Sequence, residues 1–261
     1  MATTVPRKDA VSTFGEAFDW LKRNPVLIGL FFVLGVVDAI GEEVPLFSLL
    51  GVLLVLYFGG IAHLFARDEL AGTAPDLAAA SSRVVGRMLS LIGIFIVYTI
   101  LVAVGLLLLI LPGIYLLLRL SLAFPACVID EQNAFESLST SWEVAHGNLF
   151  KLLGISILAI LAYLAAAIIA AIIAAAGGAG AFAIVIVVSA VVSAVVQPTV
   201  EMAYARIYLE NRHTDPEDDS AVSPGSSAGR ESVRDERDDW DDESTRDDRS
   251  GHGWDRRDDG R

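Results

Sequence analysis

The stretch that decides the fold is residues 89–129, LSLIGIFIVYTILVAVGLLLLILPGIYLLLRLSLAFPACVI. It holds 41 nearly unbroken apolar positions. A helix needs about 20 residues to cross roughly 30 Å of hydrocarbon, so this stretch is too long for one span and long enough for two. Leu111-Pro112-Gly113 lies between the two halves and combines residues that punctuate helices. The stretch therefore predicts a tight hairpin of two transmembrane helices that turns at these three residues.

The rest of the chain contains further apolar runs of similar length. A turn at 177–180, Gly-Gly-Ala-Gly, separates the last two runs. The first run is short and contains Asp38, so whether it fully crosses the membrane is left open. We predict an all-α integral membrane bundle of six transmembrane helices within residues 11–212. The six predicted spans are 26–41, 46–66, 89–111, 114–129, 151–176 and 182–206.

Charge is distributed unevenly along the chain. The net charge is −13, although 54% of the residues are hydrophobic and the mean hydropathy is +0.57. Residues 213–261 hold 8 Arg and 17 Asp plus Glu and few apolar residues, which predicts a disordered, acidic, cytoplasmic tail. Residues 1–10 are also predicted to be disordered. An acidic, lysine-poor composition is typical of a high-salt cytoplasm, as in a halophilic archaeon.

The tail suggests which partners the protein has. Its acidic charge should repel nucleic acid, so no nucleic-acid partner is expected. Trp240 and Trp254 lie within runs of acidic residues and Arg, and they leave open a protein partner that docks on the tail. Membrane lipid is the other expected partner.

Loop charges give the orientation. Basic residues lie before the first span, between the second and third, at the start of the fifth and at the end of the sixth, whereas the outer loops carry Glu42 and Glu43 and neither Lys nor Arg. By the positive-inside rule, both termini are cytoplasmic and the protein is a multi-pass component of the cell membrane. Residues 1–25 lack the apolar core of a secretory signal, so the first span is expected to remain as an anchor.

An internal threefold pattern accompanies the spans. Amphipathic stretches at 11–23, 74–87 and 134–150 precede the three hairpins. Each enters its span in a similar way, through NPVLIGL, RMLSLIGI and NLFKLLGI, which align at Gly29, Gly93 and Gly154. We interpret this as three parallel repeats of an interfacial helix followed by a hairpin. The alternative is that amphipathic and apolar patterns look alike by default.

Familiar catalytic motifs are absent from the sequence. Cys127 is the single cysteine, and no H-E-x-x-H, G-x-x-x-x-G-K-[ST] or G-x-S-x-G occurs. We therefore expect a non-enzymatic protein with no metal and no cofactor.

Ionisable residues inside predicted spans are costly and often functional. Asp38 and Arg119 both fall in the outer half by this topology, and either pair with each other or reach the headgroups separately. His63 and Glu201 fall near the inner ends of their spans and form either a proton-sensitive latch or two separate interfacial groups.

Span six carries a polar stripe, Ser189, Ser193, Gln197 and Glu201, at i, i+4 spacing. Span five carries small residues at the same spacing from Ala162 to Gly178. These stripes either pack the two helices closely or line a hydrated crevice toward the cytoplasm, which Pro198 would help to open. Trp20 and Trp142 are expected to anchor at headgroup level.

Residues 111–153, LPGIYLLLRLSLAFPACVIDEQNAFESLSTSWEVAHGNLFKLL, carry a resemblance. A Pro-Gly turn (Pro112, Gly113), Arg119, Pro125, an acidic pair and a Ser-Trp helix resemble the membrane domain of the glycerophosphoryl diester phosphodiesterase family and related YciC-like membrane proteins. The resemblance implies the membrane module without its catalytic domain, since residues 213–261 are too few for a barrel of about 250 residues.

The sequence thus predicts a structural or regulatory membrane protein, or a scaffold for partners. The alternatives are a carrier or flippase-like protein for an anionic lipid or small solute, and an accessory subunit of a lipid-processing enzyme. In the carrier, Arg119 and the polar stripe would contact the anionic group.

Overall fold

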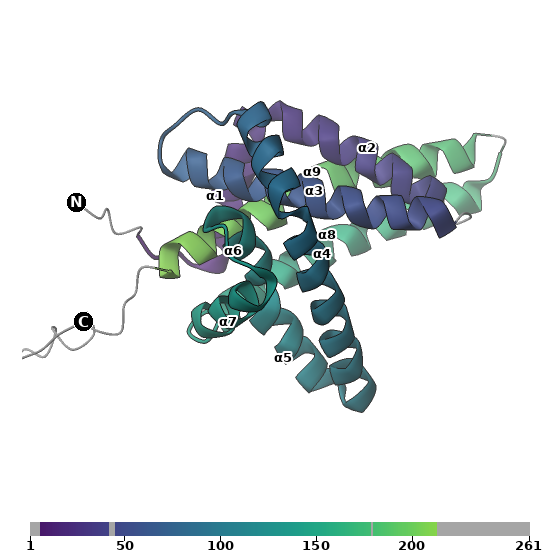
Figure 1. The fold of residues 1–261 in the computed structure, drawn as a ribbon. Coiled ribbons are helices and arrows are strands. Elements are labelled where there is room, and N and C mark those ends of the chain that lie inside the picture. The colour runs from purple at the N-terminus through teal and green to yellow at the C-terminus, as the bar shows by residue number, and fades with distance from the viewer. Residues whose placement is uncertain (1–5, 42–44, 179, 213–261) are drawn as a thin grey trace, which may run out of the picture. The chain divides into compact units, whose positions relative to one another are not determined.

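The structure is a computed structural model that describes residues 6–41, 45–178 and 180–212 (Figure 1). Its regular elements within these ranges are all α-helices, so the all-α prediction is confirmed there. The predicted tail, residues 213–261, lies outside the described residues. The helices are α1 (Ala10–Arg23), α2 (Pro25–Gly41), α3 (Pro45–Leu70), α4 (Leu77–Leu108), α5 (Ile110–Leu120), α6 (Ala123–Ile129), α7 (Ala134–Val144), α8 (Leu149–Ala176) and α9 (Ala181–Asn211).

Five helical segments are long and apolar enough to cross a membrane: Ser48–Leu70, Leu77–Leu108, Ile110–Ile129, Leu149–Ala176 and Ala183–Asn211. The predicted first span, now α2, qualifies only together with α1, and the two helices are bent by 97°. By length and composition, the described part of the chain therefore has five helical segments able to span a membrane, or six if the bent pair is one span.

The bend between α1 and α2 has a local cause. Asn24 ends α1 and Pro25 begins α2, where its missing N–H is no loss because the first N–H groups of a helix have no partner within it. The Asn24 side chain donates to the Trp20 carbonyl oxygen at 2.9 Å and to Glu69 of α3 at 2.6 Å. Trp20 itself is only 4% exposed, so the prediction that it anchors at headgroup level is wrong for this residue.

The predicted interfacial helix at 74–87 is not a separate element. Its residues from Leu77 onward are the first turns of α4, which runs unbroken for 32 residues. At 1.5 Å per residue this helix is about 48 Å long, which exceeds the hydrocarbon thickness and leaves its first turns outside it. Separate amphipathic helices exist only as α1 and α7 among the described residues.

The predicted turn at Leu111-Pro112-Gly113 is displaced. The break is a single extended residue, Leu109 (φ −161°, ψ 145°), and Pro112 is the third residue of α5. Proline fits there because the first-turn N–H groups have no helical acceptor. The same argument places Pro125 as the third residue of α6, and a break at Ser121-Leu122 divides predicted span four into α5 and α6.

The other predicted turn is confirmed at its described residues. Gly177 and Gly178 have φ values of 67° and 109°, which residues with a side chain rarely adopt. They join α8 to α9. Pro198 lies inside α9, which continues through it as one helix.

Helix α9 lies at the centre of the bundle and contacts α1, α2, α3 and α8. A Cβ atom on Gly35 of α2 would lie 2.8 Å from the Cα atom of Ala190, so the backbones of α2 and α9 nearly touch. The half-buried Ala162, Ala166 and Ala170 lie on the side of α8 that packs on α9. Small residues thus bring both neighbours close to α9.

The α4–α5 hairpin points away from the α2–α3 and α8–α9 hairpins (Figure 1). Gly105 and Gly113 allow its helices to meet, since a Cβ atom on Gly105 would lie 2.9 Å from the Gly113 Cα atom. Its tip is strongly exposed and apolar, with Leu107 at 87% and Leu111 at 80%. Such a surface requires an apolar environment such as lipid.

Candidate functional site

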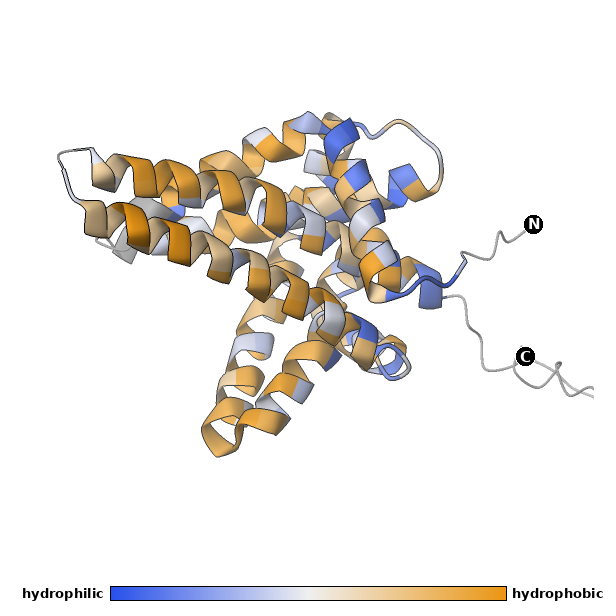
Figure 2. Cartoon of the chain, turned by 180° about the vertical axis from the view of Figure 1, so that it is seen from behind, coloured by the Kyte–Doolittle hydropathy of each residue, from blue (hydrophilic) through white to orange (hydrophobic). Residues whose placement is uncertain are grey.

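Polar residues gather at one end of the bundle. Figure 2 shows hydrophilic residues at the end that contains α1, the α3–α4 loop and α7, and hydrophobic residues along the helices beyond it. Several ion pairs join residues from different segments of the chain. Arg23 contacts Glu69 at 2.5 Å, Lys151 contacts Glu210 at 2.7 Å, and Arg87 contacts Glu131 at 3.3 Å.

Arg206 is the centre of the largest of these networks. Its side chain is 1% exposed and contacts Glu16 of α1 and Glu210 of α9, and it donates to the Pro6 carbonyl oxygen at 3.1 Å. Lys8 adds a contact to Glu16 at 3.1 Å. Arg206 is one of the basic residues at the end of the sixth predicted span, and the structure encloses it, so it joins α1 and the segment before it to α9.

Asp9 caps the helix that this network holds. Its carboxylate accepts from the backbone N–H of Ser12 at 3.4 Å. Hydrogen bonds from Ser12 lower the pKa of the Asp9 carboxyl below its ordinary value.

Arg119 forms a second enclosed site, at the junction of α5 and α7. Its guanidinium is 4.5 Å from the Trp142 ring centroid and 5.4 Å from that of Tyr115. It donates to the Tyr115 hydroxyl at 2.8 Å and to the Trp142 carbonyl oxygen. The Ser141 hydroxyl donates a hydrogen bond to the Arg119 carbonyl oxygen at 2.8 Å. These contacts pin α7 across α5.

Asp38 lies elsewhere in the bundle. A Cβ atom on Gly51 of α3 would lie 2.7 Å from its Oδ1 atom. No ion pair joins Asp38 to Arg119 in the described ranges, so the interpretation in which they pair is not the arrangement found.

The structure does bring His63 and Glu201 together, from α3 and α9. The Nε2 atom of His63 lies 3.4 Å from Glu201 Oε2, and its Nδ1 atom lies 3.0 Å from the Glu201 carbonyl oxygen. The His63 side chain is 2% exposed and that of Glu201 is 23% exposed. Gly59 makes room for the carboxylate, since its Cβ position would lie 3.6 Å from the Glu201 Cδ atom.

This pair borders a cavity of about 160 Å³ between α3, α4, α6 and α9, which we call the central cavity. Its lining is Val55, Leu56, Gly59, Gly60, His63, Leu91, Phe95, Tyr98, Phe124 and Glu201. Of the predicted polar stripe on α9, Glu201 lines this cavity, whereas Ser189, Ser193 and Gln197 are half-buried elsewhere on the helix.

Pro198 lacks the N–H that would donate to the Ala194 carbonyl oxygen. The next residue adds a side-chain bond one position along, since the Thr199 hydroxyl donates to the Val195 carbonyl oxygen at 2.6 Å. The backbone of α9 passes the proline without a break between described helical residues.

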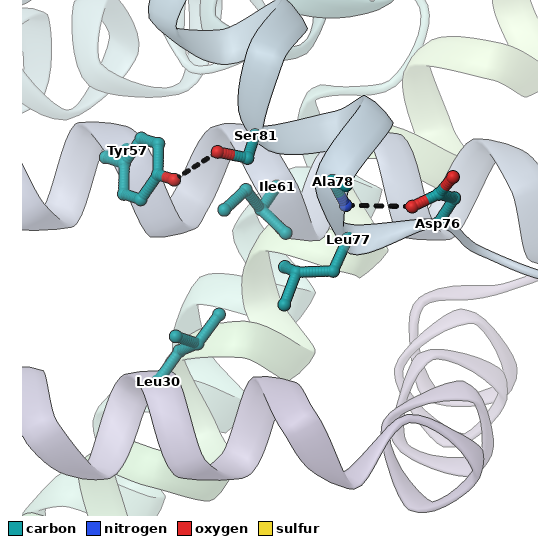
Figure 3. A pocket seen from close by; sticks show the side chains of 7 residues that line it. All are labelled: Leu30, Tyr57, Ile61, Asp76, Leu77, Ala78 and Ser81. Atoms are coloured by element: carbon teal, nitrogen blue, oxygen red, sulfur yellow. Dashed lines mark hydrogen bonds between the residues drawn. The ribbon is translucent and has the colours of Figure 1, made fainter.

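A second cavity, of about 490 Å³, lies between α2, α3 and the start of α4, and we call it the side cavity (Figure 3). Leu30 of α2 lies across from Leu77 and Ile61 in this view. Polar groups flank the gap: the Tyr57 and Ser81 hydroxyls are 2.5 Å apart, and Asp76 accepts from the Ala78 N–H at 2.8 Å.

Sequence reasoning missed the acidic members of these sites. Glu16, Glu69 and Glu210 pair with cations that are distant in sequence or on other helices. A local signal existed only for Glu210, which stands at i+4 from Arg206.

Among the described residues, no group of three or more His, Cys, Asp or Glu side chains could hold a metal ion. The chain matches no protein-family model, no curated protein and no solved structure.

Proposed function

We propose that this chain is a non-enzymatic, multi-pass protein of the cell membrane that acts as a structural or regulatory scaffold. The observation that carries the proposal is the enclosure of Arg119. Its guanidinium is occupied by the Tyr115 hydroxyl, the Trp142 carbonyl oxygen and two aromatic rings. A carrier for an anionic group needs a cation that is free to meet it, whereas an arginine that joins two helices serves architecture.

The proposed orientation places both termini in the cytoplasm. Support comes from basic residues that form ion pairs near the starts or ends of helices: Arg23 ends α1, Lys151 lies in the first turn of α8, and Arg87 lies in the first half of α4. Basic residues on one side of a membrane mark the cytoplasmic side. An even number of crossings, with α2 as the sixth, agrees with this orientation.

The threefold repeat is also proposed, and two helix contacts support it. A Cβ atom on Gly93 of α4 would lie 3.3 Å from the Cβ atom of Ala134, the first residue of α7. A Cβ atom on Gly154 of α8 would lie 2.8 Å from the Cβ atom of Ala10, the first residue of α1. In each case the aligned glycine of one repeat meets the start of another repeat's amphipathic helix. Gly29, the third aligned glycine, has no atom within 4 Å of its Cβ position.

The third contact of this kind, between Gly29 and the start of α4, is therefore not made. Leu30, next to Gly29, lines the side cavity together with Asp76 and Leu77, which begin α4 (Figure 3). The start of the remaining amphipathic segment thus lies across a gap from Leu30, the residue that follows the third aligned glycine. A threefold pattern in which two of the three glycine contacts are made and the third is replaced by a gap would give this arrangement.

The likeness to the phosphodiesterase family's membrane domain stays a proposal. Its support is that Arg119, Ser141 and Trp142 of the quoted pattern meet in one site. The acidic pair that follows Pro125 also acts in packing: Asp130 contacts Arg212 and the Tyr208 hydroxyl on α9, and Glu131 contacts α4 through Arg87.

The scaffold proposal requires a partner, and the expected docking segment is the acidic tail, residues 213–261. We would extract the full chain gently from its native membranes and record native mass spectra of it and of a variant that lacks the tail. A protein bound in fixed stoichiometry to the full chain and lost with the tail supports the scaffold. If that protein is a lipid-processing enzyme, the role is that of an accessory subunit. A chain that carries no protein in either form contradicts the proposal.

A further inference from the structure

We infer that the central cavity binds a small organic ammonium ion beside Glu201. This site goes beyond the scaffold proposal and does not depend on it. The inference rests on the size of the cavity, on its aromatic lining and on a carboxylate whose charge has one partner.

The cavity has room for a small molecule. Its volume of about 160 Å³ is close to that of engineered protein cavities of about 150 Å³ that hold benzene. An ammonium ion with three or four carbon atoms therefore fits.

Three aromatic rings line the site. Phe95 and Tyr98 come from α4, and Phe124 comes from α6. Tyr98 and Phe124 are fixed against each other, with ring centroids 5.6 Å apart and planes at 74°. Aromatic rings attract cations through their quadrupole, and several rings around one space are a recurring way to bind ammonium groups.

Glu201 supplies the charge. A carboxylate that borders a largely apolar cavity is stabilised by a cation or a proton. The partner in the structure is His63, and the hydrogen-bond network defines its tautomer. The Glu201 carbonyl oxygen, 3.0 Å from Nδ1, can only accept, so Nδ1 carries a hydrogen. Nε2 and Oε2, 3.4 Å apart, are then two acceptors that face each other, and a proton or a cation between them would stabilise this arrangement.

Other titratable groups around Glu201 do not replace that proton. Three tyrosines, Tyr98 of α4, Tyr163 of α8 and Tyr204 of α9, are near enough to Glu201 to interact with it electrostatically, and a phenol is ordinarily neutral near pH 7. One turn beyond His63 on α3, Arg67 is held by Asp68 at 2.7 Å. Cys127 on α6 is a buried thiol, and Asp38 on α2 lies against Gly51.

An ammonium ion can take the place of such a proton. One of its N–H groups donates to Oε2 and another to Nε2, while its carbon atoms face the rings. One proton then leaves as one cation enters, so the net charge of the cavity is unchanged. The site is thus a proton–cation exchange site.

The test is calorimetric titration of the purified full-length chain with propylammonium, at several pH values and in buffers of different protonation enthalpy. We expect saturable binding, release of about one proton and an affinity that rises roughly tenfold per pH unit while the pair holds its proton. Neutral 1-propanol, nearly the same size, should bind at least about tenfold more weakly. Absence of saturable binding, equal binding of the alcohol, or no proton release overturns the inference.

Two variants and a control locate the site. In Glu201→Gln the amide can donate to His63 Nε2, so the helix contact is kept, but propylammonium binding should be lost. Phe124→Leu should weaken binding about 3- to 30-fold by removing one ring. Ser189→Ala, on the same helix but outside the cavity lining, should bind as the unchanged chain does. Full binding by Glu201→Gln places the ligand elsewhere and contradicts the inference.

Discussion

The guanidinium of Arg119 donates a hydrogen bond to the backbone carbonyl oxygen of Trp142, which stands 23 residues later in the chain. The contact is made to backbone, so it depends on the position of α7 rather than on the identity of residue 142. The ring of Trp142 adds a cation–π contact at 4.5 Å. One arginine thereby fixes where an amphipathic helix crosses a membrane-spanning one.

Replacing Arg119 should loosen that crossing. Arg119→Gln removes hydrogen bonds from a charged donor and two cation–π contacts, and should cost about 2–4 kcal/mol of stability. Arg119→Lys keeps the charge but not the planar fork, so its stability should lie between those of the unchanged chain and Arg119→Gln. Thermal unfolding in detergent, followed by tryptophan fluorescence, measures both. Equal melting temperatures for all three chains would mean that Arg119 has no structural role.

Arg206 should contribute more to stability than its position at the end of the sixth predicted span suggests. Arg206→Ala leaves Glu16 and Glu210 with fewer cations in a buried network and should cost about 3–5 kcal/mol. The matched control is Lys22→Ala, which breaks the exposed pair with Asp19 and should cost less than about 1 kcal/mol. Protease cleavage before α1 should speed up in the Arg206 variant alone. Similar cleavage rates in both variants would argue against the network.

Two glycines provide a matched comparison of helix approach. Gly35→Ala introduces a Cβ atom 2.8 Å from the Ala190 backbone and should destabilise the α2–α9 contact by about 1–3 kcal/mol. Gly29→Ala, two turns earlier on the same helix, meets nothing within 4 Å and should be neutral or stabilise by up to about 1 kcal/mol. Melting temperatures of the two variants decide the matter, and the reverse order would show that α2 packs differently.

The Asp76 cap should stabilise the start of α4. Its carboxylate accepts from the N–H groups of Ala78 and Ala79, at 2.8 and 3.3 Å. Asp76→Ala should cost about 1 kcal/mol and Asp76→Asn much less, because asparagine also caps well. Hydrogen exchange of the first turns of α4 would report the change. Unaltered exchange in the alanine variant would count against the cap.

Acid should weaken the corresponding cap of α1. Because Ser12 lowers the folded pKa of Asp9 below its unfolded value, the cap's contribution is present above the unfolded pKa. It is lost as pH falls through the folded pKa, and Asp9→Asn should remove this pH dependence. Helix content and exchange of α1 between about pH 2 and pH 5 test the sign. A cap that strengthens as pH falls would be inconsistent with the geometry.

Hydropathy predicted the membrane helices well because burial in lipid requires long, continuous apolar runs. The span from Leu149 to Ala176 was visible in that way, and so was the glycine turn after it. The break at Leu109 was not, because proline is compatible with the first turn of a helix as well as with a turn. The continuity of α4 was hidden for another reason. Its amphipathic start and its apolar remainder differ in composition, although the backbone is one helix.

Side-chain sites were predictable only where a rare residue marked them. Ionisable groups inside apolar runs singled out Asp38, His63, Arg119 and Glu201, but the sequence left open whether His63 and Glu201 meet or lie apart. The burial of Arg206 was not predictable, because Glu16 stands 190 residues away in sequence. Contacts of this kind depend on how helices are ordered around the bundle, which periodicity does not encode.

The central claim, that the chain is a scaffold and that Arg119 is architectural, has one direct measurement. Native mass spectra of Arg119→Gln, extracted from membranes below its melting temperature, would be compared with those of the unchanged chain. The account predicts that the folded variant keeps the same protein partner in the same stoichiometry. Loss of a bound anionic lipid or solute from a variant that remains folded would contradict it and identify a carrier instead.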